Sequence, residues 1–199
     1  AYNAYDGAVR PACGDLDGDG MAEIVLGFSP FPGQGGYVAV YRQLFGGQHW
    51  DWIRLPWSTY NAACGGTRPA CGDIDGDGRA ELVVGLDPFP TWGGYCAIFD
   101  DAQAGYKHLD WLRVPHVEYI QANGETRPAC GDVDGDGKDE VLVGLGTFAP
   151  NTSNVAVFHN PAIKSLDVRW IGIESTPYNE VNGEAWVTLG RFGRAGIAK

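Results

Sequence analysis

One phrase of eighteen residues occurs three times in the chain, and this repeat constrains the fold more than any other feature. RPACGDLDGDGMAEIVLG begins at Arg10, RPACGDIDGDGRAELVVG at Arg68 and RPACGDVDGDGKDEVLVG at Arg127, so the copies lie 58 and 59 residues apart. A unit of that length can hold one multi-stranded sheet, and arrays of such units bury their faces against each other. The sequence therefore predicts a single repeat domain over residues 1–199.

Each repeat contains four short apolar runs, which in the first copy are PACGDL, EIVLG, GYVAVY and HWDWIRLP. The runs lack the 3.6-residue period of a helix of useful length, so they indicate four-stranded sheets. The central runs are apolar without alternation, which implies sheets covered on both faces. Radial repetition of such sheets predicts an all-β fold of β-propeller-type blades, with three complete four-stranded repeats plus one terminal strand. The expected units are blade 1 (2–59), blade 2 (60–118), blade 3 (119–177) and a partial fourth repeat (178–199).

An acidic loop with the pattern D-x-D-G-D-G-x-x-E separates the first two runs of each repeat. Its four carboxylates would repel one another strongly unless a cation lay among them. Oxygen ligands in a flexible, glycine-containing loop suit Ca²⁺ better than the strictly octahedral Mg²⁺, and the variable seventh residue would contribute only its backbone carbonyl. The sequence predicts three Ca²⁺ sites, formed by Asp15, Asp17, Asp19, Met21 and Glu23, by Asp73, Asp75, Asp77, Arg79 and Glu81, and by Asp132, Asp134, Asp136, Lys138 and Glu140.

Two other interpretations compete with calcium binding at the acidic loops. An EF-hand loop needs a bidentate glutamate at position twelve and a following helix. Position twelve is Leu26, Val84 or Val143, inside a β-rich run, so the EF-hand interpretation fails. Solvated acidic turns without metal would account for one isolated loop, but three copies with the glutamate in register favour cation binding.

The phrase GDxDGDGxxE, followed by an apolar strand that ends in glycine, resembles the FG-GAP or VCBS-type repeat of integrin-α-like β-propellers. The resemblance covers residues 2–177 as three units, and it implies that each loop joins the first two strands of a blade and binds Ca²⁺. The Phe-Gly and Gly-Ala-Pro segments of that family are replaced here, by Val9-Arg10-Pro11 and Gly27-Phe28-Ser29 in the first unit. Integrin-type ligand binding is therefore not implied.

The fourth repeat restarts the pattern but lacks the acids. Its expected first strand covers residues 185–192, and two cations stand among the residues at the ligand positions, which excludes a metal there: Arg191, Gly193, Ala195 and Lys199. Three blades and a strand cannot close a ring. Three arrangements remain, namely a fragment of a longer propeller, a homo-oligomeric ring, or a polymer in which the terminal strand completes a neighbouring subunit. We expect self-association, with the terminal strand as the donated element.

Composition and charge narrow the function classes. The formal net charge is −11, and the 14 basic residues form no run, which argues against nucleic acid as a partner. No apolar stretch approaches the roughly 18 residues of a membrane span. Loops of this kind fill readily at millimolar extracellular calcium, and Asn151-Thr152-Ser153 is a glycosylation sequon. We therefore expect an extracellular or cell-surface protein.

The five cysteines do not form a disulfide framework in the sequence. Cys13, Cys71 and Cys130 recur in the phrase PACGD, so they occupy equivalent rather than complementary positions. An odd count of this kind predicts small thiols packed in a repeated core. A Cys64–Cys96 bridge stays open as an alternative.

The expected function is structural or adhesive, with a protein or glycan as ligand, and not enzymatic, since the regularly spaced acids are already assigned to calcium. The alternative is a carbohydrate-binding lectin that uses the non-repeated Trp57, Trp92 and Trp186. The repeated tryptophans are expected to pack between blades, and the repeated arginines to pair with a carboxylate of their own or an adjacent blade. These residues are Trp52, Trp111 and Trp170, and Arg10, Arg68 and Arg127.

Overall fold

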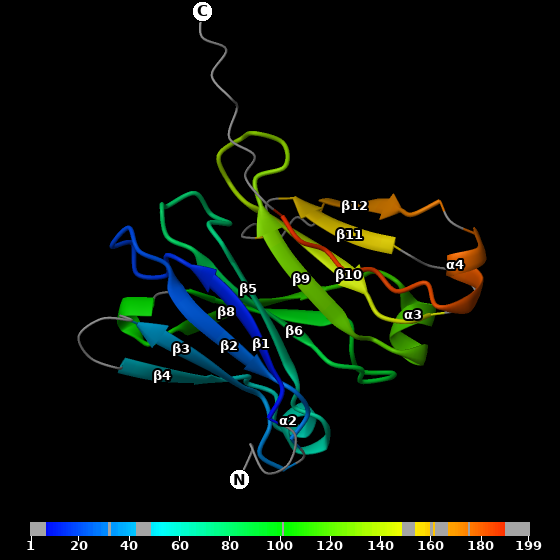
Figure 1. Ribbon diagram of the computed structural model, residues 1–199, viewed down its shortest axis with the longest axis horizontal. Helices are drawn as coiled ribbons and strands as arrows, with labels where there is room; N and C mark the ends of the chain where they lie inside the picture. Colours follow the sequence, from blue (N-terminus) through cyan, green and yellow to red (C-terminus); the bar gives the residue numbers. More distant parts are fainter. Residues whose placement is uncertain are drawn as a thin grey trace, which may run out of the picture.

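The computed structural model is an array of three antiparallel sheets (Figure 1). It describes residues 7–31, 33–42, 49–100, 102–148, 154–159, 161, 167–174 and 176–189. The first sheet contains β1 (Val9–Gly14), β2 (Glu23–Phe28), β3 (Tyr37–Arg42) and β4 (His49–Arg54). The second contains β5 (Thr67–Gly72), β6 (Glu81–Leu86), β7 (Tyr95–Asp100) and β8 (Lys107–Arg113), and the third contains β9 (Thr126–Gly131), β10 (Glu140–Leu145), β11 (Asn154–His159) and β12 (Asp167–Gly172).

Strand order within each sheet follows chain order, and every neighbouring pair is antiparallel. This is the meander of a propeller-type blade, and it confirms the prediction of three four-stranded all-β repeats. The register is also repeated. In the pairing of third and fourth strands, Trp52 faces Ala39, Trp111 faces Ala97 and Trp170 faces Ala156.

Burial of the second strands follows their place in the array. Strands β6 and β10 are buried along their whole length, whereas β2 alternates between buried and half-buried residues. The second blade has a sheet on each side, so its core residues, such as Val83 and Val84, are fully enclosed. The first blade has a neighbouring sheet on one side only, which explains its partly exposed strand.

Adjacent blades approach so closely that only glycine fits at the crossing. A Cβ atom on Gly85 would lie 2.3 Å from the carbonyl oxygen of Thr126 and 2.5 Å from the ring of Pro128. Gly27 meets Thr67 and Pro69 of the second blade in the same way. The repeated glycine near the end of each second strand therefore leaves the space that the first strand of the next blade occupies.

Three short helices, which the sequence analysis did not predict, precede the second blade, the third blade and the C-terminal segment: α2 (Ser58–Ala63), α3 (Val117–Ala122) and α4 (Thr176–Val181). Six residues are too few to show an apolar period, so no helical signal is visible in the sequence. Each helix carries a repeated tyrosine, and the hydroxyls of Tyr60 and Tyr119 donate to the carbonyls of Gly66 and Glu125. These buried tyrosines fix the turn into the next blade. A short 3₁₀ helix, η1 (Ala102–Ala104), follows β7.

Residues 183–189 occupy the place of the next first strand on the third blade. The Ala185 amide donates to the Leu145 carbonyl at 2.8 Å, and a Cβ on Gly144 would lie 2.4 Å from the Ala185 carbonyl. Val187 and Leu189 pack against the apolar residues of that blade. The described part of the predicted 185–192 strand thus docks where expected, although none of its residues joins a strand ladder; the remainder, with the four altered ligand positions, lies outside the described residues.

All five cysteines are free thiols, so no Cys64–Cys96 bridge forms. Cys96 is buried and Cys71 and Cys130 are half-buried, but Cys13 is exposed on β1, the first strand that the structure describes. The expectation of buried thiols is therefore wrong for this one copy. No helix among the described residues is long and apolar enough to cross a membrane.

Candidate metal centres

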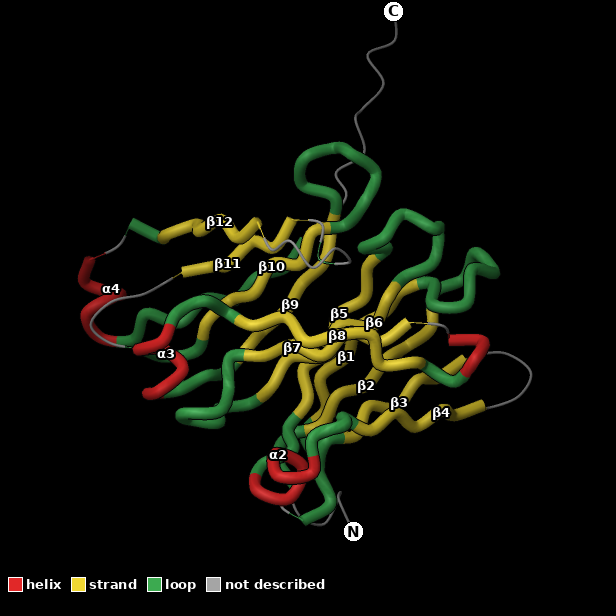
Figure 2. The backbone as a smooth tube through the Cα atoms, turned by 180° about the vertical axis from the view of Figure 1, so that it is seen from behind, coloured by secondary structure: helices red, strands yellow, loops and turns green. Residues whose placement is uncertain are grey.

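The three acidic loops emerge side by side on one side of the array, opposite the short helices (Figure 2). In each loop the first aspartate closes the turn by accepting backbone hydrogen bonds. Asp15 accepts from Gly18 at 2.8 Å and from Gly20 at 2.9 Å, and Asp73 and Asp132 accept from the matching glycines. These glycines have positive φ angles, which a glycine adopts without strain. The sequence D-x-D-G-D-G thus folds locally into a loop that turns its carboxylates inward.

The third, fifth and seventh positions continue this arrangement. Asp19 accepts the amide of the seventh residue, Met21, at 2.8 Å, and the amides of Arg79 and Lys138 donate in the same way to Asp77 and Asp136. The seventh residue therefore lies in the loop through its backbone, while its side chain varies. The predicted role of its carbonyl as a cation ligand stays a prediction.

The glutamate at the ninth position begins the second strand and is buried in every blade. One oxygen of Glu81 accepts the Ile74 amide at 2.7 Å, and Glu23 and Glu140 bind the equivalent amides. Glu81 is 1% exposed, and its other oxygen, Oε1, has no hydrogen-bond partner among the described residues. A buried carboxylate oxygen without a donor is costly, and a cation in the loop would remove that cost.

The predicted ligands gather into compact sets whose ligand atoms lie within 4.8 Å of one another. The sets are Asp15, Asp17 and Asp19 in the first loop, Asp73, Asp75 and Glu81 in the second, and Asp132, Asp134 and Asp136 in the third, where Asp134 and Glu140 also meet His159. Glu23 and Asp77 do not belong to these sets. The donor atoms are predominantly carboxylate oxygens, which fit Ca²⁺.

The pKa values of the buried glutamates also indicate a cation site. The pKa of Glu81 is raised to about 8. Burial is the largest cause, the charges of Asp75, Asp100 and Asp73 add to it, and the hydrogen bond from Ile74 opposes it. Burial also raises the pKa of Glu23 in the first loop. Glu81 and Glu23 therefore resist ionisation, and a divalent cation beside them would favour their charged forms.

Successive loops are also hydrogen-bonded to each other, a feature that the sequence did not reveal. The Ala80 amide donates to the Asp15 carbonyl at 2.8 Å, and the Asp139 amide donates to the Asp73 carbonyl at 2.7 Å. The Arg79 side chain lies over Gly18 of the preceding loop. The eighth position thus joins neighbouring loops into one row.

A second feature missed in the sequence is the last residue of each third strand. Arg42, Asp100 and His159 occupy this equivalent position at the ends of β3, β7 and β11. Arg42 forms an ion pair with Asp17 at 3.6 Å, and His159 Nδ1 lies 3.5 Å from both Asp134 and Glu140. Because the three residue types differ, no repeat signal marked them.

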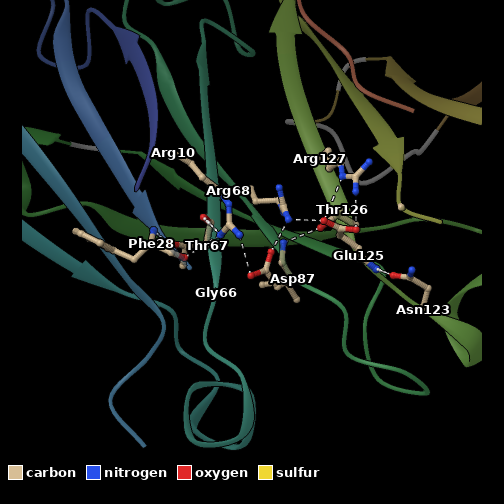
Figure 3. Close-up of polar contacts among 12 residues, drawn as sticks. Arg10, Phe28, Gly66, Thr67, Arg68, Asp87, Asn123, Glu125, Thr126 and Arg127 are labelled. Carbon is tan, nitrogen blue, oxygen red and sulfur yellow. Dashed lines mark hydrogen bonds and ion pairs between the residues drawn. The ribbon is translucent and has the colours of Figure 1, made fainter. Parts of the chain in front are cut away.

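The repeated arginines form a row of ion pairs between blades, away from the loops (Figure 3). Asp87 lies between Arg10 at 3.2 Å and Arg68 at 2.8 Å. Arg68 also pairs with Glu125 of the next blade, and Arg127 pairs with Glu125 at 2.9 Å. The predicted pairing with carboxylates of the same and adjacent blades is confirmed, and the row fastens successive blades together.

The tryptophans are arranged differently from the prediction. Trp52 is 60% exposed and stacks on Phe28 of its own blade, and Trp170 is 41% exposed, so these two do not fill an interface between blades. Both lie on outer strands, and Trp170 has His116, which precedes the third blade, 6.1 Å from its ring. Trp111 is half-buried and packs edge-on against Trp57 at 5.6 Å.

Two of the non-repeated tryptophans meet in an open pocket of about 430 Å³ on the second blade. Trp92 is 65% exposed, whereas Trp57 is half-buried. The pocket is lined by Pro56, Trp57, Thr91, Trp92, Tyr95, Trp111 and Arg113. Trp186 lies elsewhere and covers the guanidinium group of Arg127, 4.0 Å from its ring centre.

The chain is similar to a known family of repeats. The FG-GAP-like repeat matches residues 15–84, which span from the first acidic loop through the second. No curated protein matches the chain.

Proposed function

We propose that this FG-GAP-type repeat protein is a calcium-stabilised, propeller-like module with a structural or adhesive role and no catalytic one. The observation that carries the calcium assignment is Glu81 Oε1, a buried carboxylate oxygen without a partner, set beside Asp73 and Asp75. A cation bound there would accept this oxygen as a ligand. When bound, Ca²⁺ would also neutralise the carboxylates that now face one another.

The consequence for the fold follows from the position of the loops. Each loop joins the first two strands of its blade, and the loops are hydrogen-bonded in a row through Ala80 and Asp139. A ligand that binds only the folded protein stabilises it by mass action. Calcium would therefore stabilise both the individual blades and their stacking.

Thermal unfolding of the full chain in excess chelator and in millimolar calcium tests this function. We expect a higher melting temperature in calcium and up to three bound ions per chain by elemental analysis. Magnesium at the same concentration is the control for ionic strength, and it should restore less of the stability. An unchanged melting temperature, with no bound calcium, would refute the assignment.

An extracellular or cell-surface location accompanies this proposal, because sites of this class fill at extracellular calcium concentrations. Self-association belongs to it as well. Val9 is 50% exposed and Pro11 and Cys13 are exposed on β1, although the matching residues of β5 pack against the glycines of the first blade. This exposed strand is where a further blade or another subunit would add to the array.

Exchange of the C-terminal segment between subunits would be the simplest mode of assembly, since residues 183–189 already bind the face of a blade. We expect the native mass to exceed that of a monomer, giving a closed oligomer or a filament. Removal of residues 184–199 should then change the native mass in sedimentation. An unchanged oligomer would count against exchange of this segment.

The aromatic pocket on the second blade favours carbohydrate binding as the second candidate function. Aromatic faces and a guanidinium group suit a sugar ring and its hydroxyls, and Arg113 lies over the Tyr95 ring at 5.2 Å. Thr91 has a φ angle of 75°, where the first blade has Gly33 at 83°, so the pocket rim holds a strained backbone.

A glycan array separates this candidate from a purely structural role. Specific binding that is lost in Trp92→Ala and retained in Trp52→Ala, an exposed tryptophan outside the pocket, would establish the lectin activity. No binding by the folded protein to any glycan would remove it.

A further inference from the structure

The three acidic loops have the same backbone hydrogen bonds, but the residue beside the buried glutamate differs from loop to loop. The pairing of second and third strands ends at Ile24 with Tyr41, at Leu82 with Phe99 and at Val141 with Phe158. One residue further along lies the ninth-position glutamate on one strand, opposite the last residue of the third strand. That last residue is Arg42, Asp100 or His159.

We propose that the residue ending the third strand sets the cation affinity and preference of its loop, so that the second loop binds calcium most tightly, the first binds it most weakly, and the third also accepts zinc. This inference rests on the proposed calcium binding and deepens it. It follows from charge and ligand chemistry at the structural position beside the buried glutamate. The four acidic residues of the loop are the same in all three copies, whereas the seventh and eighth residues vary.

In the first loop a positively charged side chain, that of Arg42, already lies beside an aspartate. The Arg42 guanidinium lies 3.6 Å from Asp17, pairs with Asp51 at 3.0 Å and donates to the Ala102 carbonyl at 3.0 Å. It also lies over the ring of Tyr106, 5.7 Å from its centre. Because these contacts hold the guanidinium in place, its positive charge opposes a divalent cation in this loop.

In the second loop the same position adds a carboxylate. Asp100 ends β7 one residue beyond Phe99, which pairs with Leu82, so the strand register places Asp100 opposite Glu81. Glu81 Oε1 is buried without a partner in this loop. A fifth carboxylate and an unpartnered ligand atom make this the strongest of the three sites for a hard divalent cation.

In the third loop the position supplies a nitrogen. His159 Nδ1 lies 3.5 Å from Asp134 Oδ2 and 3.5 Å from Glu140 Oε1, and the three ligand atoms fall within 4.8 Å of one another. His159 is largely buried, with 14% of its side chain exposed, and Glu140 is buried. Calcium prefers oxygen ligands alone, whereas one imidazole and two carboxylates form a donor set that zinc accepts.

Calorimetric titration of the chelator-treated full chain with calcium tests the affinity order. We expect at least two resolved classes of site in the wild-type protein. Asp100→Asn should weaken the tightest class about tenfold, since it removes one charge a few ångströms from a divalent ion in a water-exposed loop. Asp110→Asn, on the outer strand of the same blade, removes the same charge and should leave all classes unchanged.

The arginine variants test the weak site. Arg42→Gln should strengthen the weakest class about tenfold, and Arg42→Lys, which keeps the charge, should not. Arg54→Gln serves as the matched control, because Arg54 lies over the Tyr37 ring, on the outer strand of the same blade. Unfolding curves in saturating calcium identify any Arg42 variant that fails to fold, in which case the Asp100 pair decides the affinity order.

A zinc titration tests the third loop. Zinc should bind one site per chain, and His159→Gln should abolish that binding while calcium still binds; His116→Gln is the control. Calcium binding with three equal affinities that neither Asp100→Asn nor Arg42→Gln alters would overturn this inference and leave the proposed function standing. Absence of calcium binding altogether would refute the proposed function itself.

Discussion

Replacement of Glu81 by glutamine should change the stability of the protein in opposite directions with and without calcium. Glu81 is 1% exposed, accepts the Ile74 amide at 2.7 Å through Oε2 and leaves Oε1 without a partner. Glutamine keeps the shape and can keep the hydrogen bond to Ile74. It removes only the charge and one carboxylate ligand.

The expected magnitudes follow from the two states of the loop. In chelator at neutral pH the pKa of about 8 leaves Glu81 largely protonated, so glutamine should alter the free energy of unfolding by less than about 1 kcal/mol, toward greater stability. In calcium the substituted loop loses its ion. For a dissociation constant of about 0.1 to 1 mM and about 10 mM free calcium, each site contributes about 1.4 to 2.7 kcal/mol, and this contribution disappears.

Urea unfolding followed by tryptophan fluorescence, in chelator and in calcium, measures both effects. Glu174→Gln, an exposed glutamate away from the loops, is the matched control and should be silent in both conditions. The reasoning would be refuted if Glu81→Gln destabilised the protein equally in chelator and in calcium, because Glu81 would then act as a structural hydrogen-bond acceptor and not as a ligand.

Three further predictions concern the blades and their loops. In chelator, the free energy of unfolding should fall as pH rises from about 4.5 toward 8, because the folded protein keeps the Glu81 proton that the unfolded chain has lost. Calcium should flatten this pH dependence. A rise in stability over that range would contradict the raised pKa of Glu81. Gly85→Ala should destabilise the protein by about 3 kcal/mol, because its Cβ would lie 2.3 Å from a backbone carbonyl, whereas Gly172→Ala, with 3.4 Å of clearance, should cost less than about 1 kcal/mol; equal shifts in the urea midpoint would contradict the close approach of the blades. Asp87→Ala should cost about 2 kcal/mol in the same assay, because it removes the buried carboxylate that Arg10 and Arg68 share and leaves Arg68 with Glu125 alone. A loss below about 0.5 kcal/mol would show that this carboxylate adds no stability.

Much of the fold could be predicted because the same pattern of apolar runs and acidic loop occurs in three copies. The apolar runs located the strands, and the loop residues turn their carboxylates inward through bonds within a few residues of sequence, as between Asp15 and Gly18. The short helices were not predicted because six residues are too few to show the apolar period of a helix. The orientation of Trp52 escaped because outer-strand exposure depends on how far the neighbouring blade extends.

The sequence by itself determined the module: its length, its four strands and the acidic loop, because these depend on local spacing that each copy repeats. Only the tertiary structure decided how the copies differ. Antiparallel pairing brings the last residue of each third strand beside the buried glutamate, and stacking joins Ala80 to the preceding loop. Those contacts join residues that are distant in the chain. Beside the buried glutamate the three copies carry Arg42, Asp100 and His159. Because these residues differ, the repeat could not identify the position, and only the folded sheet identifies it.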